Sequence, residues 1–167
     1  MNLYFRLPLV LLHARRKESL TPLDESVLQF RVLPTDLNLG GRMHTGCYLS
    51  IMELGCVDLM TRIGFLKLTW KQRWLPQMIA VNMRYLSSLK FLQRYELSTR
   101  LLCWDNRWIY LEQRFRYDNK TVAVGQIKAA VYGRSGTIAP GYILELLGYD
   151  PSSPMMPTVI QHWMRVT

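Results

Sequence analysis

Cysteine is scarce in this chain of 167 residues, and its scarcity argues against both a disulfide framework and a zinc site. The three cysteines, Cys47, Cys56 and Cys103, are an odd number and form no CxxC or Cys/His spacing. The sequence therefore predicts neither a disulfide framework nor a zinc site, and we expect no metal. A reducing compartment, the cytoplasm, is the expected location.

A long hydrophobic run is also missing. The apolar run at residues 7–12 is too short to span a bilayer and is interrupted by Pro8, and no secretory signal pattern surrounds it. Three basic residues follow at 15–17. Two interpretations of residues 1–17 stay open: the segment packs on its own domain, or it makes a peripheral contact with an anionic membrane surface.

Acidic residues are few, with 12 Asp plus Glu against 21 Lys plus Arg, which gives a net charge of +9. Residues 62–100 hold most of the excess, because their eight Lys and Arg are opposed by Glu96 alone. This balance favours an anionic partner. Aromatic residues are interleaved with these charges, but most of them fall on strand positions expected to face the core. We therefore expect no nucleic-acid partner.

Hydrophobic periodicity predicts an α+β domain. Residues 48–63 place apolar side chains around most of a helix. Five stretches read as strands, and the later ones are joined by short turns that make them antiparallel neighbours; the stretches are 28–33, 78–89, 94–104, 108–117 and 121–132. These elements predict an antiparallel five-stranded sheet wrapped around one long central helix. Gly125 marks a bulge or a close approach within the last strand.

Three segments divide the chain by composition. Residues 1–27 form an apolar and basic N-terminal arm, residues 28–136 the domain itself, and residues 137–167 a C-terminal extension. We expect one short helix near 142–147 in this extension, followed by a proline-rich tail.

The loop before the helix carries the densest set of reactive side chains. It includes Asp36 and Asn38, and it leads into the helix start, where the backbone N–H groups of Thr45, Gly46 and Cys47 are predicted to be free. Such groups can polarise a carbonyl, and a nearby carboxylate can act as base or nucleophile. The arrangement suits attack on an activated acyl carbonyl.

This loop resembles the signature D-x-D-x-x-x-H-x-N-N-x-x-Y of hot-dog-fold acyl-CoA thioesterases, the 4-hydroxybenzoyl-CoA thioesterase-like group. The stretches RVLPTDLNLGGRMHTGCYL and TRLLCWDNRWIYLEQRF, with QHW near the end, are similar to the thioesterase-superfamily-member-6-like branch. The resemblance covers residues 28–133 well. It implies a hot-dog fold, a homodimer or dimer of dimers, a thioester site at the dimer interface and an acyl-CoA substrate. Coenzyme A is then part of the substrate, and no separate cofactor is expected.

The chain departs from this signature where the chemistry is expected. Asn38 stands at the position of the usual catalytic carboxylate, Arg42 at that of the histidine, and His44 and Thr45 replace the paired asparagines. An amide cannot act as base or nucleophile in the manner of a carboxylate. Asn38 is expected to hydrogen-bond a substrate carbonyl or the loop backbone.

Two carboxylates could replace the missing one. Asp36 directs a water in one interpretation and braces the loop amides in the other. Glu53 lies inside the apolar helix and is expected to be buried. The resemblance to hot-dog enzymes that use a helix carboxylate makes it the second candidate for the catalytic group. In the other interpretation, it is a buried acid that is hydrogen-bonded to Arg42, His44 or a partner chain. His44 is either a general base or an ordinary loop histidine.

The resemblance also assigns a role to part of the basic segment. It implies that Arg84, Lys90 and Arg94 contact the phosphates of coenzyme A; otherwise they are solvated surface charges. Two functions follow. The protein hydrolyses an acyl-CoA thioester to a free acid and CoA, or it is a catalytically impaired hot-dog domain that binds acyl-CoA or an acyl-carrier partner without turnover.

Overall fold

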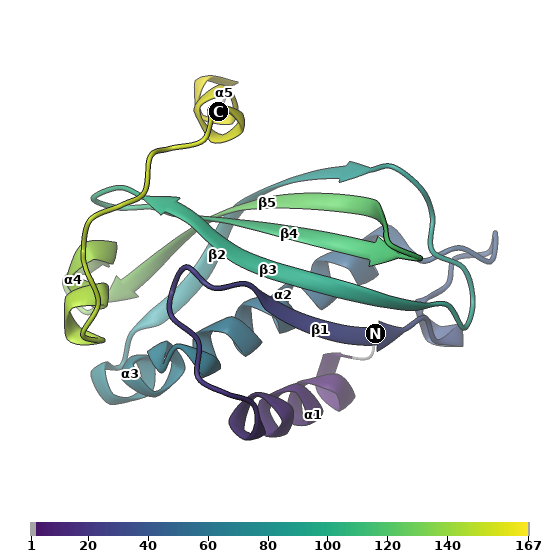
Figure 1. Ribbon diagram of the computed structural model, residues 1–167, viewed down its shortest axis with the longest axis horizontal. Helices are drawn as coiled ribbons and strands as arrows, with labels where there is room; N and C mark the ends of the chain where they lie inside the picture. The colour runs from purple at the N-terminus through teal and green to yellow at the C-terminus, as the bar shows by residue number, and fades with distance from the viewer. Residues whose placement is uncertain (1–2, 167) are drawn as a thin grey trace.

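One long helix organises the fold. The computed structural model describes residues 3–166, and Figure 1 shows helix α2 (Thr45–Arg62) running beneath a curved sheet. Buried side chains such as Ile51, Met52 and Leu54 point from α2 in several directions, because other elements cover it on more than one side. Gly64 follows with a φ of 82°, which allows the chain to turn sharply after the helix. The predicted central helix is confirmed.

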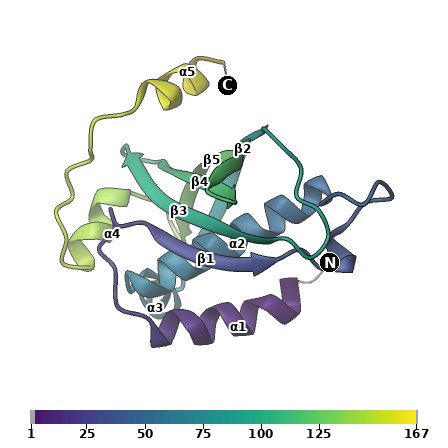
Figure 2. The same cartoon turned by 45° about the vertical axis from the view of Figure 1, so that its right-hand side comes forward.

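The sheet is antiparallel throughout and follows the order β1-β3-β4-β5-β2, with the short strand β6 paired to β5. The strands are β1 (Ser26–Arg31), β2 (Leu75–Tyr85), β3 (Arg94–Trp104), β4 (Ile109–Tyr117), β5 (Lys120–Gly133) and β6 (Gly136–Ile138). Asp118 and Asn119 have positive φ and form the predicted tight turn between β4 and β5. Figure 2 shows the curvature of the sheet around α2. The predicted five-stranded antiparallel sheet around a long helix is confirmed, with β6 as an added short strand.

The helix lies very close to the sheet at two glycines. A Cβ on Gly55 of α2 would lie 2.7 Å from Gln113 Nε2, and a Cβ on Gly125 of β5 would collide with the Met52 side chain. A side chain at either position would force its neighbours to move. The close approach predicted at Gly125 is therefore present, and Gly55 is its counterpart on the helix.

Strand β2 is displaced from its predicted range of 78–89. It begins at Leu75, directly after helix α3 (Phe65–Gln72), and Pro76 is tolerated because β2 is an edge strand. It ends at Tyr85 because the next residues turn away: the N–H groups of Leu86 and Ser87 both donate to Val122 O. Alternating hydrophobicity alone does not reveal such a turn.

The N-terminal segment folds as a helix against the domain. Helix α1 (Leu3–Arg16) contains Pro8, yet Val10 and Ala14 on its inner side are buried. Their packing holds the helix where its own backbone bonds are weakened by proline. Of the two interpretations of this segment, packing on its own domain is therefore observed. No helix among residues 3–166 is both long and apolar enough to cross a membrane.

The C-terminal segment adds two helices. Helix α4 (Pro140–Leu146) lies near its predicted place, whereas helix α5 (Thr158–Val166) replaces part of the expected tail. Ile160 of α5 is fully buried with Cys103 and Tyr110. In Figure 1, α5 lies on the side of the sheet opposite α2. Apolar cover for the outer face of β3 and β4 explains why this segment is ordered.

Candidate active site

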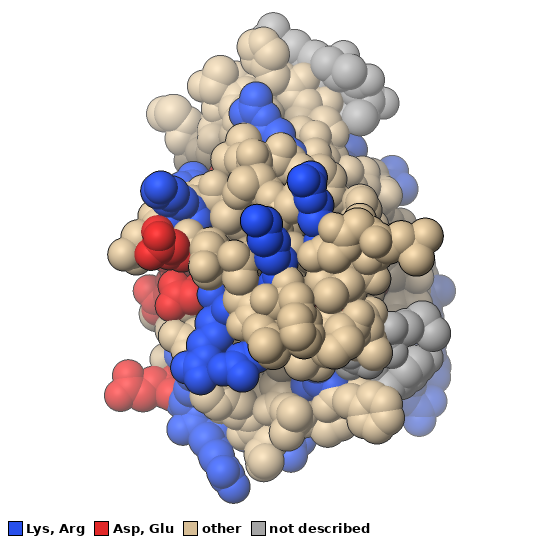
Figure 3. Space-filling view, turned by 90° about the vertical axis from the view of Figure 1, so that its right-hand side faces the viewer, with Lys and Arg blue, Asp and Glu red and all other residues tan. Residues whose placement is uncertain are grey.

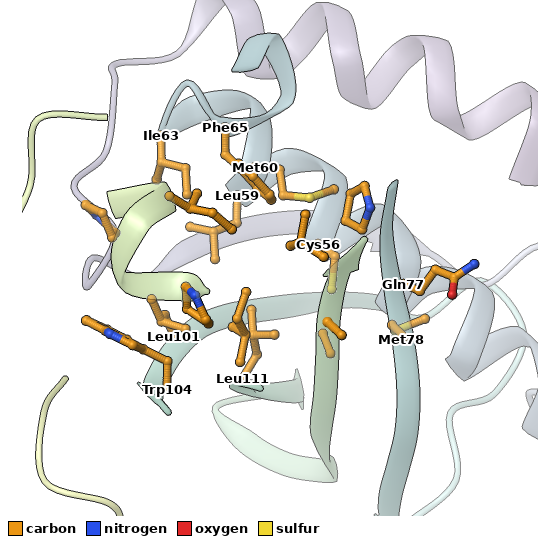
Figure 4. A pocket seen from close by; sticks show the side chains of 18 of the residues that line it. Cys56, Leu59, Met60, Ile63, Phe65, Gln77, Met78, Leu101, Trp104 and Leu111 are labelled. Carbon is orange, nitrogen blue, oxygen red and sulfur yellow. The ribbon is translucent and has the colours of Figure 1, made fainter. Parts of the chain in front are cut away.

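A large apolar cavity lies beside the second half of α2. It has a volume of about 810 Å³, and Figure 4 shows side chains from α2, α3, β3 and β4 converging on it, with β2 along one side. Ile143, Leu144 and Leu147, in and just after α4, add a further wall. Most of its lining is hydrocarbon, so the cavity suits an acyl chain rather than a polar ligand.

Glu53 is the one charged side chain among the described residues that line this cavity. It lies on a stripe of α2 with Leu49, Val57 and Met60, which also line the cavity. The expectation that Glu53 is buried is wrong for the single chain, in which its side chain is exposed. Within residues 3–166 it has no hydrogen bond or ion pair. The carboxylate is therefore free to meet a substrate or a water.

Cys56 lies one helical turn from Glu53 and also lines the cavity. Burial, and to a lesser degree the negative charge of Glu53, raises the pKa of the Cys56 thiol to about 12. A thiol with such a pKa is protonated near neutral pH and is a poor nucleophile. The Cys56 thiol is therefore not the nucleophile, and Glu53 stays the candidate on this side of α2.

Asp36 is engaged in an internal contact. Its Oδ2 accepts a hydrogen bond from Arg6 Nη2 at 2.6 Å and another from the Leu33 N–H at 2.9 Å. The residue is only 2% exposed and does not line the cavity. Of its two interpretations, these contacts favour a brace that fixes the loop and attaches α1 to it.

Asn38 closes its own loop. Its Oδ1 accepts hydrogen bonds from the N–H groups of Gly40 at 2.9 Å and Arg42 at 3.1 Å, and its backbone N–H donates to Arg42 O. Gly41 supplies the positive φ of 68° that this tight loop needs. The expected bond from Asn38 to the loop backbone is present.

His44 caps α2 and uses two of the three amides predicted to be free. The Gly46 N–H donates to His44 Nδ1 at 3.0 Å, and the Cys47 N–H donates to His44 O at 2.9 Å. The prediction of free donors is therefore wrong for Gly46 and Cys47. The Thr45 N–H has no partner among the described residues and stays a candidate. The role of His44 as N-cap was not predicted from the sequence, because histidine is not among the residues that usually cap helices.

The three cations predicted to contact phosphate do not form one cluster. Lys90 pairs through its backbone with Arg42, which brings two positive side chains to the loop before α2. Arg94 lies directly opposite Arg31 on β1, in a separate polar cleft that also contains Arg116. Arg84 lies on β2 at the other edge of the sheet. Figure 3 shows Lys and Arg side chains spread over the face of the molecule that lies on the right in Figure 1.

Two parts of the site, Arg6 and the wall formed by α4, were not predicted from the sequence. Arg6, which holds Asp36, is thirty residues away in the chain, and no local pattern links the two. The α4 wall of the cavity was assigned to an extension rather than to a binding site. Both are tertiary contacts, which periodicity cannot reveal. No three His, Cys, Asp or Glu side chains in the described part of the chain gather as metal ligands.

Sequence comparisons show which known proteins the chain is similar to. Residues 32–164 match the thioesterase-like superfamily. The chain is 32% identical over 146 residues to Protein THEM6 of Danio rerio, covering 86% of this chain and 70% of that protein. It is 30% identical over 137 residues to Protein THEM6 of Xenopus laevis, covering 80% of this chain but 64% of that protein. The chain thus spans about two thirds of the length of these relatives.

Solved structures share the fold. A DHNA-CoA thioesterase from Staphylococcus aureus superposes with a TM-score of 0.64 at 12% identity, covering 85% of this chain and 90% of its own. A second Staphylococcus aureus protein, solved in complex with CoA, superposes with a TM-score of 0.66 at 10% identity, covering 86% and 96%. At these identities the likeness establishes the hot-dog architecture alone.

Proposed function

Because the chain belongs to the thioesterase-like superfamily, we propose that it hydrolyses an acyl-CoA thioester to a free acid and CoA, with Glu53 as the catalytic carboxylate. One observation carries the proposal: among the described residues, Glu53 is the one charged group on the wall of an otherwise hydrophobic cavity of about 810 Å³. Such a carboxylate meets the thioester at the mouth of an acyl site.

The chemistry needs only a water and this carboxylate. The oxygen of the water attacks the thioester carbon while Glu53 takes a proton from that water, and the C–S bond then breaks. The proton passes to the departing CoA sulfur, which leaves as the thiol. The free Thr45 N–H at the start of α2 lies eight residues from Glu53, about 12 Å along the helix, which is too far for both to act on one carbonyl within a single copy. In a thioester site at the dimer interface, the Thr45 N–H of the second copy would polarise the carbonyl oxygen.

We further propose that a second copy pairs along β2, giving a homodimer, with a dimer of dimers as the larger form. This edge strand is eleven residues long, and Leu75, Ile79 and Tyr85 on it are exposed. A long unpaired edge with apolar side chains is a template for another strand. Light scattering after gel filtration measures the mass of the particle, and a monomer at micromolar concentration would refute this pairing.

Of the three cations predicted to contact the phosphates of coenzyme A, we propose that Lys90 does so, with Arg42 beside it. Both belong to loops next to the start of α2, where the Thr45 amide is free. Replacing Lys90 by Gln should raise KM severalfold with little change in kcat, because the contact is equally strong in substrate and transition state. Arg84 and Arg94 lie on other strands and serve as matched controls.

The test is release of free thiol from short, long and aromatic acyl-CoAs. We expect turnover with at least one of them, and faster turnover with long chains because the cavity is large and apolar. Narrowing the cavity with Leu144→Trp should shift the preference toward short chains. No turnover on any of them by folded protein would reject the hydrolase.

The competing function, binding without turnover, has one observation in its favour. The position of the family's usual carboxylate holds Asn38, and its Oδ1 is committed to loop amides. Calorimetric binding of an acyl-CoA or an acyl-carrier partner without thiol release would favour this function. A gain of hydrolysis in Asn38→Asp would then show that the loop carboxylate had been lost.

A further inference from the structure

Helix α1 has an outer surface that no described part of the chain covers. Phe5, Leu9 and Leu12 are 80%, 67% and 49% exposed. They are spaced by four and three residues, so they form one stripe along the helix. The opposite side, with Val10 and Ala14, is buried against the core. The outer apolar stripe is therefore not required for the packing of α1.

The basic side chains of α1 also lie on two sides of the helix, one facing the domain and one facing outward. Arg6 turns inward to Asp36, and the neighbouring Lys17 donates from its Nζ to Val27 O. Arg15 and Arg16, in the last turn, are exposed and have no acidic partner among the described residues. Residues 3–16 contain no acid at all. The outer surface of α1 thus combines an apolar stripe with unpaired positive charge.

We propose that α1 docks on an anionic lipid surface, with its apolar stripe in the headgroup region and Arg15 and Arg16 against acidic headgroups. Interfacial helices have this combination of exposed apolar and basic side chains. A helix of fourteen residues is about 21 Å long, enough to lie in the interface and too short to cross it. The charge on the helix selects the lipid surface over an apolar protein partner.

The position of α1 leaves this surface accessible in the proposed dimer. Lys17 and Arg6 bind backbone carbonyls of β1, and β1 is the edge of the sheet opposite β2. Figure 1 shows α1 on the far side of α2 from the sheet. Antiparallel pairing along β2 keeps the same faces of two sheets on one side, so both α1 helices would face one membrane. Two weak contacts then reinforce each other.

Flotation of the full chain with vesicles tests the proposal. We expect binding to vesicles of phosphatidylcholine with about one third phosphatidylserine to exceed binding to phosphatidylcholine alone by roughly tenfold or more, since each basic residue near the surface adds to the attraction. Leu9→Glu and Arg15→Glu should each reduce binding to the anionic vesicles severalfold. Met155→Glu is the matched control, because Met155 is 92% exposed in a segment away from α1.

Three results would overturn the proposal: no flotation of the unaltered chain, flotation of Leu9→Glu equal to that of the unaltered chain, or a change of particle mass in Leu9→Glu, which would make the stripe an interface between copies. Circular dichroism confirms that the variants fold. Thiol release measured without lipid keeps the two proposals separate, because docking without turnover would reject the hydrolase alone.

Discussion

The loop before α2 and the cavity side of α2 lie next to each other in the chain but differ in what their polar groups do. In the loop, Asp36, Asn38 and His44 are each committed to an internal hydrogen bond. On the helix, Glu53 has no such partner within the described residues. Groups that satisfy one another build structure, whereas a free carboxylate on an apolar wall is available for chemistry. The loop should therefore govern stability and the helix stripe should govern rate.

The largest effect should come from the helix stripe. Glu53→Gln keeps the shape of the side chain but removes the base, so kcat for thiol release should fall by roughly 10² to 10⁴-fold with the fold unchanged. Glu18→Gln, at an exposed glutamate after α1, is the control and should keep the full rate. Full activity of Glu53→Gln would reject the assignment of the catalytic residue.

A change of the second carboxylate should affect stability instead. Asp36→Ala removes the partner of Arg6 in a pair whose side chains are 12% and 2% exposed, and the free energy of unfolding should fall by about 3 kcal/mol. Chemical denaturation measures this loss. The rate per folded molecule should change little; an inactive variant of normal stability would instead make Asp36 the catalytic group.

The helix cap should have a smaller effect. His44→Ala leaves the Gly46 N–H without its acceptor, and we expect a loss of about 1 kcal/mol in the free energy of unfolding. His162→Ala, at an exposed position of α5, is the matched control in a thermal melt. A large loss of rate at unchanged stability would show that His44 is a general base and would remove the contrast between loop and helix.

The smallest effect should come from Cys56, the other reactive group on the stripe. Because its pKa is raised to about 12, the thiol stays protonated up to strongly alkaline pH and contributes no nucleophile. The rate of Cys56→Ala should stay within about twofold of the unaltered chain, and iodoacetamide at pH 8 should leave activity intact. Rapid inactivation by iodoacetamide that Cys56→Ala abolishes would point to the thiol.

The sequence predicted the parts of the fold that local patterns determine. The apolar helix, the strand alternation and the turn at Asp118 and Asn119 depend on neighbours in the chain, and apart from the displaced β2 they are found close to where they were expected. Helices α1, α3 and α5 were missed because their order comes from packing: Val10, Phe65 and Ile160 are buried only in the folded molecule. Local periodicity does not contain that information.

The candidate site, too, could be predicted only in part. The residue types at Asp36, Asn38 and Glu53 could be selected from the sequence, but their states depend on partners such as Arg6, thirty positions from Asp36. The prediction of a buried Glu53 failed because an apolar helix need not be covered on every side by its own chain. The amide of Gly46 is not free because it donates to the His44 imidazole, and that of Cys47 is not free because it donates to the His44 carbonyl.

The close contact at Gly55 has a consequence for the direction in which Glu53 points. Two residues along a helix correspond to about 200° of rotation. With Gly55 pressed against Thr99 and Gln113, Glu53 is turned away from the sheet. A rotation of α2 by a single residue would bring a side chain into the narrow space that Gly55 leaves between helix and sheet. Gly55 thus fixes the rotation of α2 about its axis and keeps Glu53 at the wall of the cavity.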